Sequence, residues 1–263
     1  MKILAQAVPD NTIAGFQRAA EHDGHTWVWW EEQHTPTFDV FDEVKPDMLF
    51  FMETTRSLEK CVVEHNVHTI QGDANNPFTF RLKTTTSKEP YVFPCDRLVD
   101  AHMFCPGDKD DAYICDIGIT CEPCSIGVNL CYPVGNVSVK VMCETPWGVP
   151  QYLGNGSLAD KCALYRSANI IVVDSMMEAM RVMSCGSIPV SVNPEVSLSI
   201  KQTEPEEDEL HLIFCPQTAP DVIDFHTTMT KTNQGVKVYD GLQTCLMGHT
   251  YDDALKVIMG EVQ

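Results

Sequence analysis

Short apolar runs that alternate with amphipathic segments are the feature that most constrains the fold of this chain. The apolar runs predict strands, and the amphipathic segments between them predict helices. In residues 1–100, strands are expected at 2–8, 25–30, 47–52 and 67–70, and helices at 12–22, 38–44 and 54–66. The predicted strands lack regular polar alternation, which is typical of strands buried on both faces of a parallel sheet. The sequence therefore predicts an α/β fold.

The second part of the chain repeats this alternation. Strands are expected at 114–120, 137–143, 170–173 and 188–192, and helices at 158–167, 176–184, 220–229 and 251–259. The pattern is weaker elsewhere, with short strands expected at 91–93, 101–104 and 212–214 and a solvated acidic loop at 204–209. The 263 residues fit two doubly wound, Rossmann-like domains, 1–100 and 101–263, facing each other across a cleft.

The charge balance limits the partners of the chain. It has 37 Asp and Glu against 18 Lys and Arg, a formal net charge of −19 with His neutral. Proteins that bind nucleic acid usually present a basic surface that displaces counterions from phosphates. Nucleic acid is therefore a less favoured partner than a small molecule, a glycan or a protein.

The sequence also bears on location. No apolar run approaches the roughly 20 residues that span a bilayer, and the first residues lack the apolar stretch of a secretory signal. Twelve cysteines without an export signal are expected to be reduced thiols. These features predict no membrane span and a cytoplasmic location.

Ligands of doubly wound sheets bind outside the carboxyl ends of the strands. The dinucleotide fingerprint G-x-G-x-x-G does not follow the first predicted strand, and no P-loop motif occurs. Residues 164–190 predict a helix, a buried strand, a turn at 175–177 onto a second helix, and a further strand. Backbone N–H groups at that turn suit a diphosphate. Alternatively, this stretch is an ordinary connection between strands and binds no ligand.

The order of several short motifs resembles a known family. Leu-Tyr-Arg-Ser-Ala stands at 164–168, and Ser-Cys-Gly-Ser-Ile-Pro-Val stands at 184–190 after an apolar strand, a serine and a helix. Further agreement lies at 21–28, 45–47, 113–119, 153–158 and 249–256. In this order the motifs resemble GT-B glycosyltransferases, particularly the spore-maturation-protein-like (CgeB-like) branch, over nearly all of the chain.

The resemblance implies a function. Proteins of this kind transfer a sugar from a nucleotide-sugar donor to an acceptor hydroxyl, without an obligatory metal or other cofactor. Residues 101–263 would bind the donor, and residues 1–100 would face the acceptor. The resemblance also favours retention of the anomeric configuration.

One position departs from the family pattern. The family carries an arginine three residues before a glutamate, and that glutamate lies five residues before a glycine and is thought to hold the donor ribose. Here Glu178 precedes Arg181, which lies five residues before Gly186, so the two residue types are exchanged. A salt bridge between them could preserve the local pair. Alternatively, Arg181 contacts the diphosphate directly, or the donor site is altered or lost.

Site residues follow from the expected strand ends and from the resemblance. The acceptor hydroxyl must lose its proton, to a carboxylate or a histidine, and N–H groups or cations must stabilise the leaving diphosphate. The catalytic candidates at strand ends are Asp10, Glu53 and Asp73, each of which could instead be a turn former or a helix cap. The donor-binding candidates are Thr120, Glu144, Trp147, Ser175, Met177, Glu178 and Arg181, with Glu144 and Trp147 expected beside the base unless Trp147 packs in the core.

Four cysteines form the pattern C-x5-C-x2-C-x6-C. They are Cys115, Cys121, Cys124 and Cys131. A tetrahedral zinc site is one interpretation. No second C-x-x-C pair with zinc-finger spacing follows, however, so free thiols are the preferred interpretation and no metal site is predicted.

Three functions compete at this point. The leading hypothesis is a metal-independent glycosyltransferase that uses a nucleotide-sugar donor and a glycan, small-molecule or protein acceptor. The second is a non-catalytic GT-B-like module that binds a nucleotide or a glycan, motivated by the exchange at Glu178 and Arg181. The third is another doubly wound nucleotide-binding enzyme.

Overall fold

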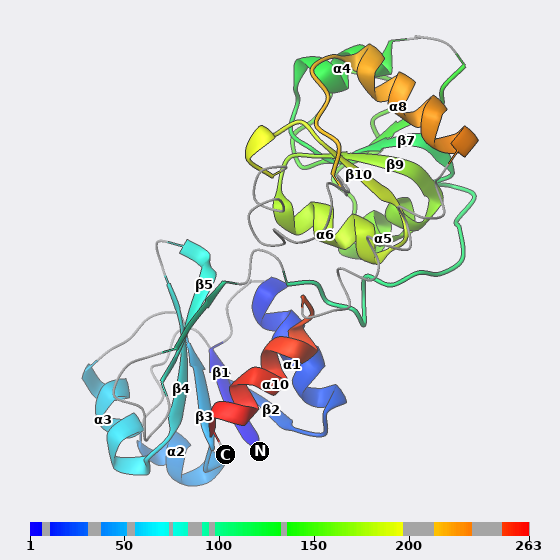
Figure 1. Cartoon of the computed structure of the whole chain (residues 1–263). Coiled ribbons are helices and arrows are strands. Elements are labelled where there is room, and N and C mark those ends of the chain that lie inside the picture. Colours follow the sequence, from blue (N-terminus) through cyan, green and yellow to red (C-terminus); the bar gives the residue numbers. More distant parts are fainter. Residues whose placement is uncertain are drawn as a thin grey trace. The chain divides into compact units, whose positions relative to one another are not determined.

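The computed structural model describes residues 1–6, 11–30, 38–51, 56–73, 76–83, 91–94, 98–132, 136–196, 213–232 and 249–262. The chain divides into two compact units (Figure 1). Unit 1 comprises Met1–Asp100 together with His249–Gln263, and unit 2 comprises Ala101–Gly248.

Unit 1 is built on a six-stranded sheet of order β2-β1-β3-β4-β5-β6. Its elements are β1 (Lys2–Gln6), α1 (Asn11–His22), β2 (Thr26–Trp30), α2 (Phe38–Val44), β3 (Met48–Phe51), α3 (Arg56–His65), β4 (His68–Asp73), β5 (Asn76–Lys83), β6 (Tyr91–Pro94) and α10 (Tyr251–Val262). Strands β1 to β4 pair in parallel, as predicted. β5 pairs in antiparallel orientation with both β4 and β6. The connections on either side of β5 are too short for the crossover that a parallel pair requires.

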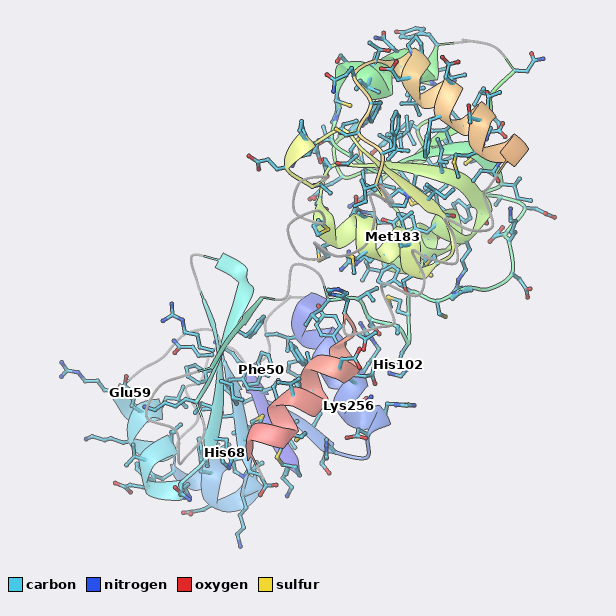
Figure 2. All side chains as sticks on the ribbon, in the orientation of Figure 1. Phe50, Glu59, His68, His102, Met183 and Lys256 are labelled. Atoms are coloured by element: carbon cyan, nitrogen blue, oxygen red, sulfur yellow. The ribbon has the colours of Figure 1, made fainter. Side chains whose placement is uncertain are left out.

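Both faces of the unit 1 sheet are covered. Along β1, Ile3 and Ala5 pack in one core cluster with residues of α1 and α10, and Leu4 packs in the other with residues of α2 and α3. The same division appears in Figure 1, where α1 and α10 lie together on one side of the sheet. Figure 2 shows Phe50 inside this unit, while Glu59 projects outward from α3. Burial on both faces explains the nonpolar character of these strands.

The last helix belongs to unit 1, which corrects the predicted domain 101–263. The Tyr251 ring lies 5.0 Å from the Phe16 ring of α1, measured between centroids. Leu255 and Ile258 are buried in the same core cluster, and a parallel bridge joins Val99 to Thr250. The boundary after Asp100 agrees with the predicted one, but residues 249–263 pack with unit 1 because their apolar face completes its core.

Unit 2 contains a four-stranded parallel sheet of order β10-β9-β7-β8. Its elements are β7 (Cys115–Ile119), α4 (Ser125–Cys131), β8 (Val139–Val141), α5 (Leu158–Ser167), β9 (Ala168–Val173), α6 (Met176–Ser184), β10 (Ile188–Ser191) and α8 (Ala219–Thr232). Helices α4 and α8 cover one face, and α5 and α6 cover the other (Figure 1). The two units thus confirm the predicted α/β class.

Some predicted elements differ from the structure. Residues 101–104 form turns instead of a strand, and Phe104 is buried with its carbonyl accepting a hydrogen bond from the Ser184 hydroxyl. The strand expected at 212–214 is reduced to a bridge between Phe214 and Val190. The acidic run 204–209 lies outside the described residues. Within the described helices, none combines the length and apolar character needed to cross a membrane.

Candidate functional site

Three loops meet at the carboxyl edge of the unit 2 sheet, defined here as residues 120–124, 174–178 and 191–193, which follow β7, β9 and β10. Asp174 holds these loops together. One of its carboxylate oxygens accepts the backbone N–H of Glu122 at 3.0 Å, and its carbonyl oxygen accepts the Asn193 amide at 3.2 Å. Parallel strands place their carboxyl ends together, which is where doubly wound sheets bind ligands.

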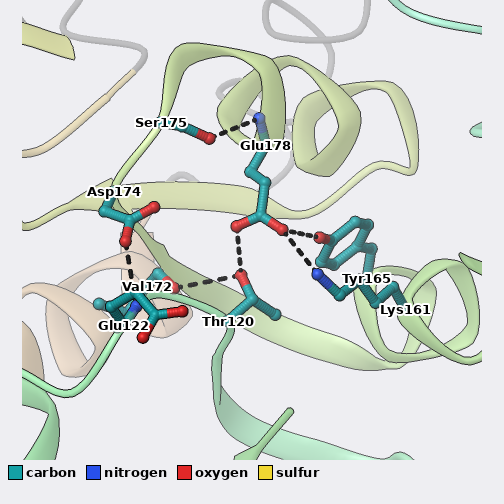
Figure 3. Close-up of polar contacts among 8 residues, drawn as sticks. All are labelled: Thr120, Glu122, Lys161, Tyr165, Val172, Asp174, Ser175 and Glu178. Carbon is teal, nitrogen blue, oxygen red and sulfur yellow. Dashed lines mark hydrogen bonds and ion pairs between the residues drawn. The ribbon is translucent and has the colours of Figure 1, made fainter. Parts of the chain in front are cut away.

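Glu178 is the buried centre of this edge (Figure 3). Glu178 is only 8% exposed to solvent. The Oε2 atom accepts the Thr120 hydroxyl at 3.0 Å, and Oε1 accepts the Lys161 ammonium at 3.2 Å and the Tyr165 hydroxyl at 3.1 Å. A carboxylate has about four lone-pair positions. The described residues therefore fill all but one of them, and the open one is on Oε2.

The partners of Glu178 are fixed donors. Tyr165 is fully buried, and burial, followed by the nearby Glu178 carboxylate, raises its pKa well above the usual value. Its phenol therefore stays protonated and donates to Glu178. Lys161 supplies the positive charge that a buried carboxylate requires.

The N-terminus of α6 adds backbone donors to the same edge. Ser175 caps the helix, and its hydroxyl accepts the Glu178 N–H at 3.3 Å. The first N–H to bond back within the helix is that of Ala179, which donates to the Ser175 carbonyl at 3.0 Å. The N–H groups of Met176 and Met177 precede that bond, and donors at this position can bind an anion.

Arg181 lies one helical turn beyond Glu178 on α6. It is 9% exposed, and its guanidinium carbon lies 4.9 Å from the centroid of the Phe104 ring. Among the described residues, Glu178 forms its ion pair with Lys161 and not with Arg181. The interpretation that the exchanged residues preserve a salt bridge with each other is therefore wrong.

The remaining candidates fall in different places. Glu144 is exposed in the segment after β8. Trp147 is buried in the core cluster beneath α4, where a Cβ on Gly127 would overlap its indole, so packing accounts for this residue. Asp10 and Glu53 lie outside the described residues, and Asp73 is the last residue of β4, with a side chain that is likewise not described.

The sequence did not single out Lys161, Asp174 or Tyr165 as site residues; Asp174 entered only as part of an expected strand-end loop, and Tyr165 only as part of the motif at 164–168. Lys161 and Tyr165 stand four residues apart on α5, so they share one helix face. That spacing was a usable signal. The spacing alone, however, does not predict that this helix face contacts Glu178.

Two of the four patterned cysteines are in contact. The Sγ atoms of Cys121 and Cys124 lie 4.0 Å apart. Cys115 and Cys131 are buried, and burial raises their pKa values to about 12 and about 11. Within the described part of the chain, no three of these sulfur atoms lie within 4.8 Å of one another. The structure therefore does not assemble the four into a zinc site.

No protein-family model and no curated protein matches this sequence. Solved structures do match. A glycosyltransferase from Rickettsia africae is 10% identical with a TM-score of 0.65, covering 99% of this chain and 97% of its own. A UDP-GlcNAc 2-epimerase from Neisseria meningitidis, bound to UDP-GlcNAc, is 10% identical with a TM-score of 0.56, covering 99% of both chains. At this identity the likeness establishes the fold, which has two Rossmann-like domains as in GT-B glycosyltransferases.

Proposed function

We propose that this chain is a glycosyltransferase that binds a nucleotide-sugar donor at the carboxyl edge of unit 2. The observation that carries the proposal is the buried Glu178 carboxylate, held by Thr120, Lys161 and Tyr165 beside the capped N-terminus of α6. The shared fold supports it, since one similar structure is a glycosyltransferase and another holds UDP-GlcNAc. The resemblance to the CgeB-like branch stays part of this proposal.

Each group at the edge has a chemical role in donor binding. The N–H groups of Met176 and Met177 donate hydrogen bonds to the diphosphate oxygens, because an anion is stabilised at a helix N-terminus. The open lone pair of Glu178 Oε2 accepts a ribose hydroxyl. Lys161 balances the charge of Glu178, and its remaining N–H donors can hydrogen-bond a phosphate of the donor. Direct contact between Arg181 and the diphosphate stays a prediction.

Transfer requires a good leaving group and a base. In the proposed reaction the helix N–H groups and Lys161 stabilise the departing nucleotide diphosphate. The candidates for the base that takes the proton of the acceptor hydroxyl are the carboxylates of Asp10, Glu53 and Asp73. Metal independence and retention of configuration are the expectations carried over from the family resemblance.

Calorimetric titration with UDP, GDP and UDP-GlcNAc tests donor binding. Glu178→Gln is expected to weaken nucleotide binding by about tenfold or more, because hydrogen bonds to charged groups contribute about 1.5–3 kcal/mol. Glu59→Gln is the matched control, since Glu59 is exposed on α3 of unit 1 (Figure 2). Absence of binding at millimolar nucleotide, or equal affinity in Glu178→Gln, contradicts the proposal.

A turnover assay separates an enzyme from a binding module. The donor is incubated with the chain without acceptor, and the products are separated by chromatography. Slow release of free nucleoside diphosphate supports transferase chemistry, with water acting as the acceptor. Binding without any turnover favours the non-catalytic alternative. An altered sugar that is still attached to the nucleotide points to an isomerase.

A further inference from the structure

Two thiols lie in the 120–124 loop of the carboxyl edge of unit 2 and have no role in the proposed donor binding. Cys121 follows Thr120 directly and is fully buried. Cys124 is half-buried and caps α4, where its Sγ accepts the Gly127 N–H at 3.3 Å. The two Sγ atoms are 4.0 Å apart. A disulfide bond is about 2.05 Å long, so closure requires a modest rotation of the two side chains.

We propose that Cys121 and Cys124 form a reversible intramolecular disulfide, with Cys124 as the attacking sulfur and Cys121 as the resolving one. The assignment of roles follows from exposure. A disulfide-containing small molecule can reach the half-buried Cys124 sulfur, whereas Cys121 can be reached only by its neighbour.

The protonation states of the two thiols suit these roles. The hydrogen bond from Cys121, followed by the backbone N–H groups of Gly127 and Ile126, lowers the pKa of Cys124 to about 6 against the opposing effect of burial. The same bond, together with burial, raises the pKa of Cys121 far above its ordinary value. At neutral pH, Cys124 is therefore the thiolate, which is the reactive form of cysteine.

The reaction balances with a low-molecular-weight disulfide as the oxidant. The Cys124 thiolate attacks one sulfur of oxidised glutathione, forming a mixed disulfide and releasing one glutathione thiolate. Cys121 then attacks the Cys124 sulfur and passes its proton to the departing sulfur, so the second glutathione leaves as a thiol. The two protein thiols lose two electrons, and the oxidant becomes two glutathione thiols.

A second thiol pair in unit 2 provides an internal comparison. The Sγ atoms of Cys162 and Cys185 lie 3.8 Å apart, closer than the first pair. Both residues, however, are only 4% exposed. If proximity alone controlled oxidation, this pair would react at least as fast. If access is also required, as we infer, the pair at Cys121 and Cys124 reacts first.

Differential alkylation of the folded chain tests the proposal. The folded chain is treated with oxidised glutathione and quenched in acid. It is then unfolded in denaturant and alkylated with a first reagent, so that every remaining thiol is labelled, before reduction and alkylation with a second reagent. Tandem mass spectrometry reads the label on each cysteine. We expect equal loss of first-reagent labelling at Cys121 and Cys124, with Cys162 and Cys185 unchanged. An unreacted Cys124, or a glutathione adduct that Cys121 never resolves, overturns the proposal.

Variants separate the two roles. In Cys124→Ala, Cys121 is expected to stay a thiol, and in Cys121→Ala, Cys124 is expected to keep the glutathione adduct. Cys131→Ala is the matched control in α4 and should form the disulfide as the wild type does. Oxidation of Cys121 in Cys124→Ala would contradict the assigned roles. The wild-type labelling depends neither on the folding of a variant nor on nucleotide binding, so it stands apart from the donor proposal.

Discussion

At Cys124 a single neighbour has the largest effect on the charge of the thiol. Because the Cys121 hydrogen bond lowers the pKa of Cys124 to about 6, thiolate is present above that pH and is lost as the pH falls through it. We expect the alkylation rate of Cys124 to rise through about pH 6 and then level off. Mass-resolved labelling across the pH range measures this profile.

Cys215 serves as the reference thiol in that experiment. It is half-buried like Cys124, and burial raises its pKa above the ordinary value. Its labelling rate should keep increasing to alkaline pH. In Cys121→Ala, the Cys124 midpoint should move upward, because its main hydrogen-bond donor is gone. A Cys124 midpoint equal to that of Cys215 would show that the pair does not form in solution.

Tyr165→Phe removes one of the donors to Glu178 and leaves the ring in place. We expect unfolding free energy to fall by about 1–3 kcal/mol, because a buried charged acceptor loses a partner. Urea unfolding followed by circular dichroism measures the change. Tyr132→Phe is the matched control in the same unit, since Tyr132 is 60% exposed. Equal stability of the two variants would mean that the phenol contributes nothing to this network.

Individual site residues were predictable to different degrees. Thr120 ends a predicted strand, Ser175 lies in the turn after one, and Glu178 lies in the first turn of a predicted helix, so the strand-end rule selects them. Their mutual contacts were not predictable, since Thr120 and Glu178 are 58 residues apart in sequence. The pairing of Glu178 with Lys161 depends on how α5 packs beside α6. Sequence spacing within one helix carries no information about that packing.

Between α1 and α10, close approach depends on one glycine. A Cβ at Gly15 would overlap the Tyr251 ring. Gly15→Ala is therefore expected to destabilise unit 1 by about 1–3 kcal/mol through overpacking. In contrast, Gly260 on α10 is exposed, with open space around it, and Gly260→Ala should stabilise that helix by up to about 1 kcal/mol. Thermal unfolding compares them, and a stabilising Gly15→Ala would contradict this packing.

Most elements were predictable because buried parallel strands and amphipathic helices have distinct patterns. The antiparallel strand β5 was missed although its pattern was present, with Phe80 and Leu82 buried and Arg81 and Lys83 exposed. This alternation is typical of a strand with one solvated face. The helix α4 was also missed, because its seven residues include Gly127, which has a low helix propensity.

At the scale of the whole molecule, α10 packs in unit 1 although unit 2 separates it in sequence from the rest of that unit. Leu255→Ala should destabilise unit 1 by about 2–5 kcal/mol, because Leu255 is buried in its core. Hydrogen exchange should then increase in β1, β3 and α1, with β7 and β9 unchanged. Val257→Ala, at a residue 49% exposed on the same helix, is the control. Faster exchange in β7 and β9 instead of unit 1 would contradict the division into units.

The division into two units was predictable near residue 100, where the alternating pattern weakens. The packing of residues 249–263 in unit 1 was not predictable. An amphipathic helix shows that it has an apolar face, but its sequence does not say which core that face completes. The bridge between Val99 and Thr250 brings the entry and exit of unit 2 together, and that contact is visible only in the fold.

The position of α10 also sets an order of events during protein synthesis. All of unit 2 is translated between Asp100 and the helix that completes unit 1. At about 5–20 residues per second, this takes roughly seven to thirty seconds. Throughout that interval the growing chain exposes the apolar face of α1 that Tyr251 and Leu255 later cover. Unit 2 can thus mature on the ribosome while unit 1, although begun first, is completed last.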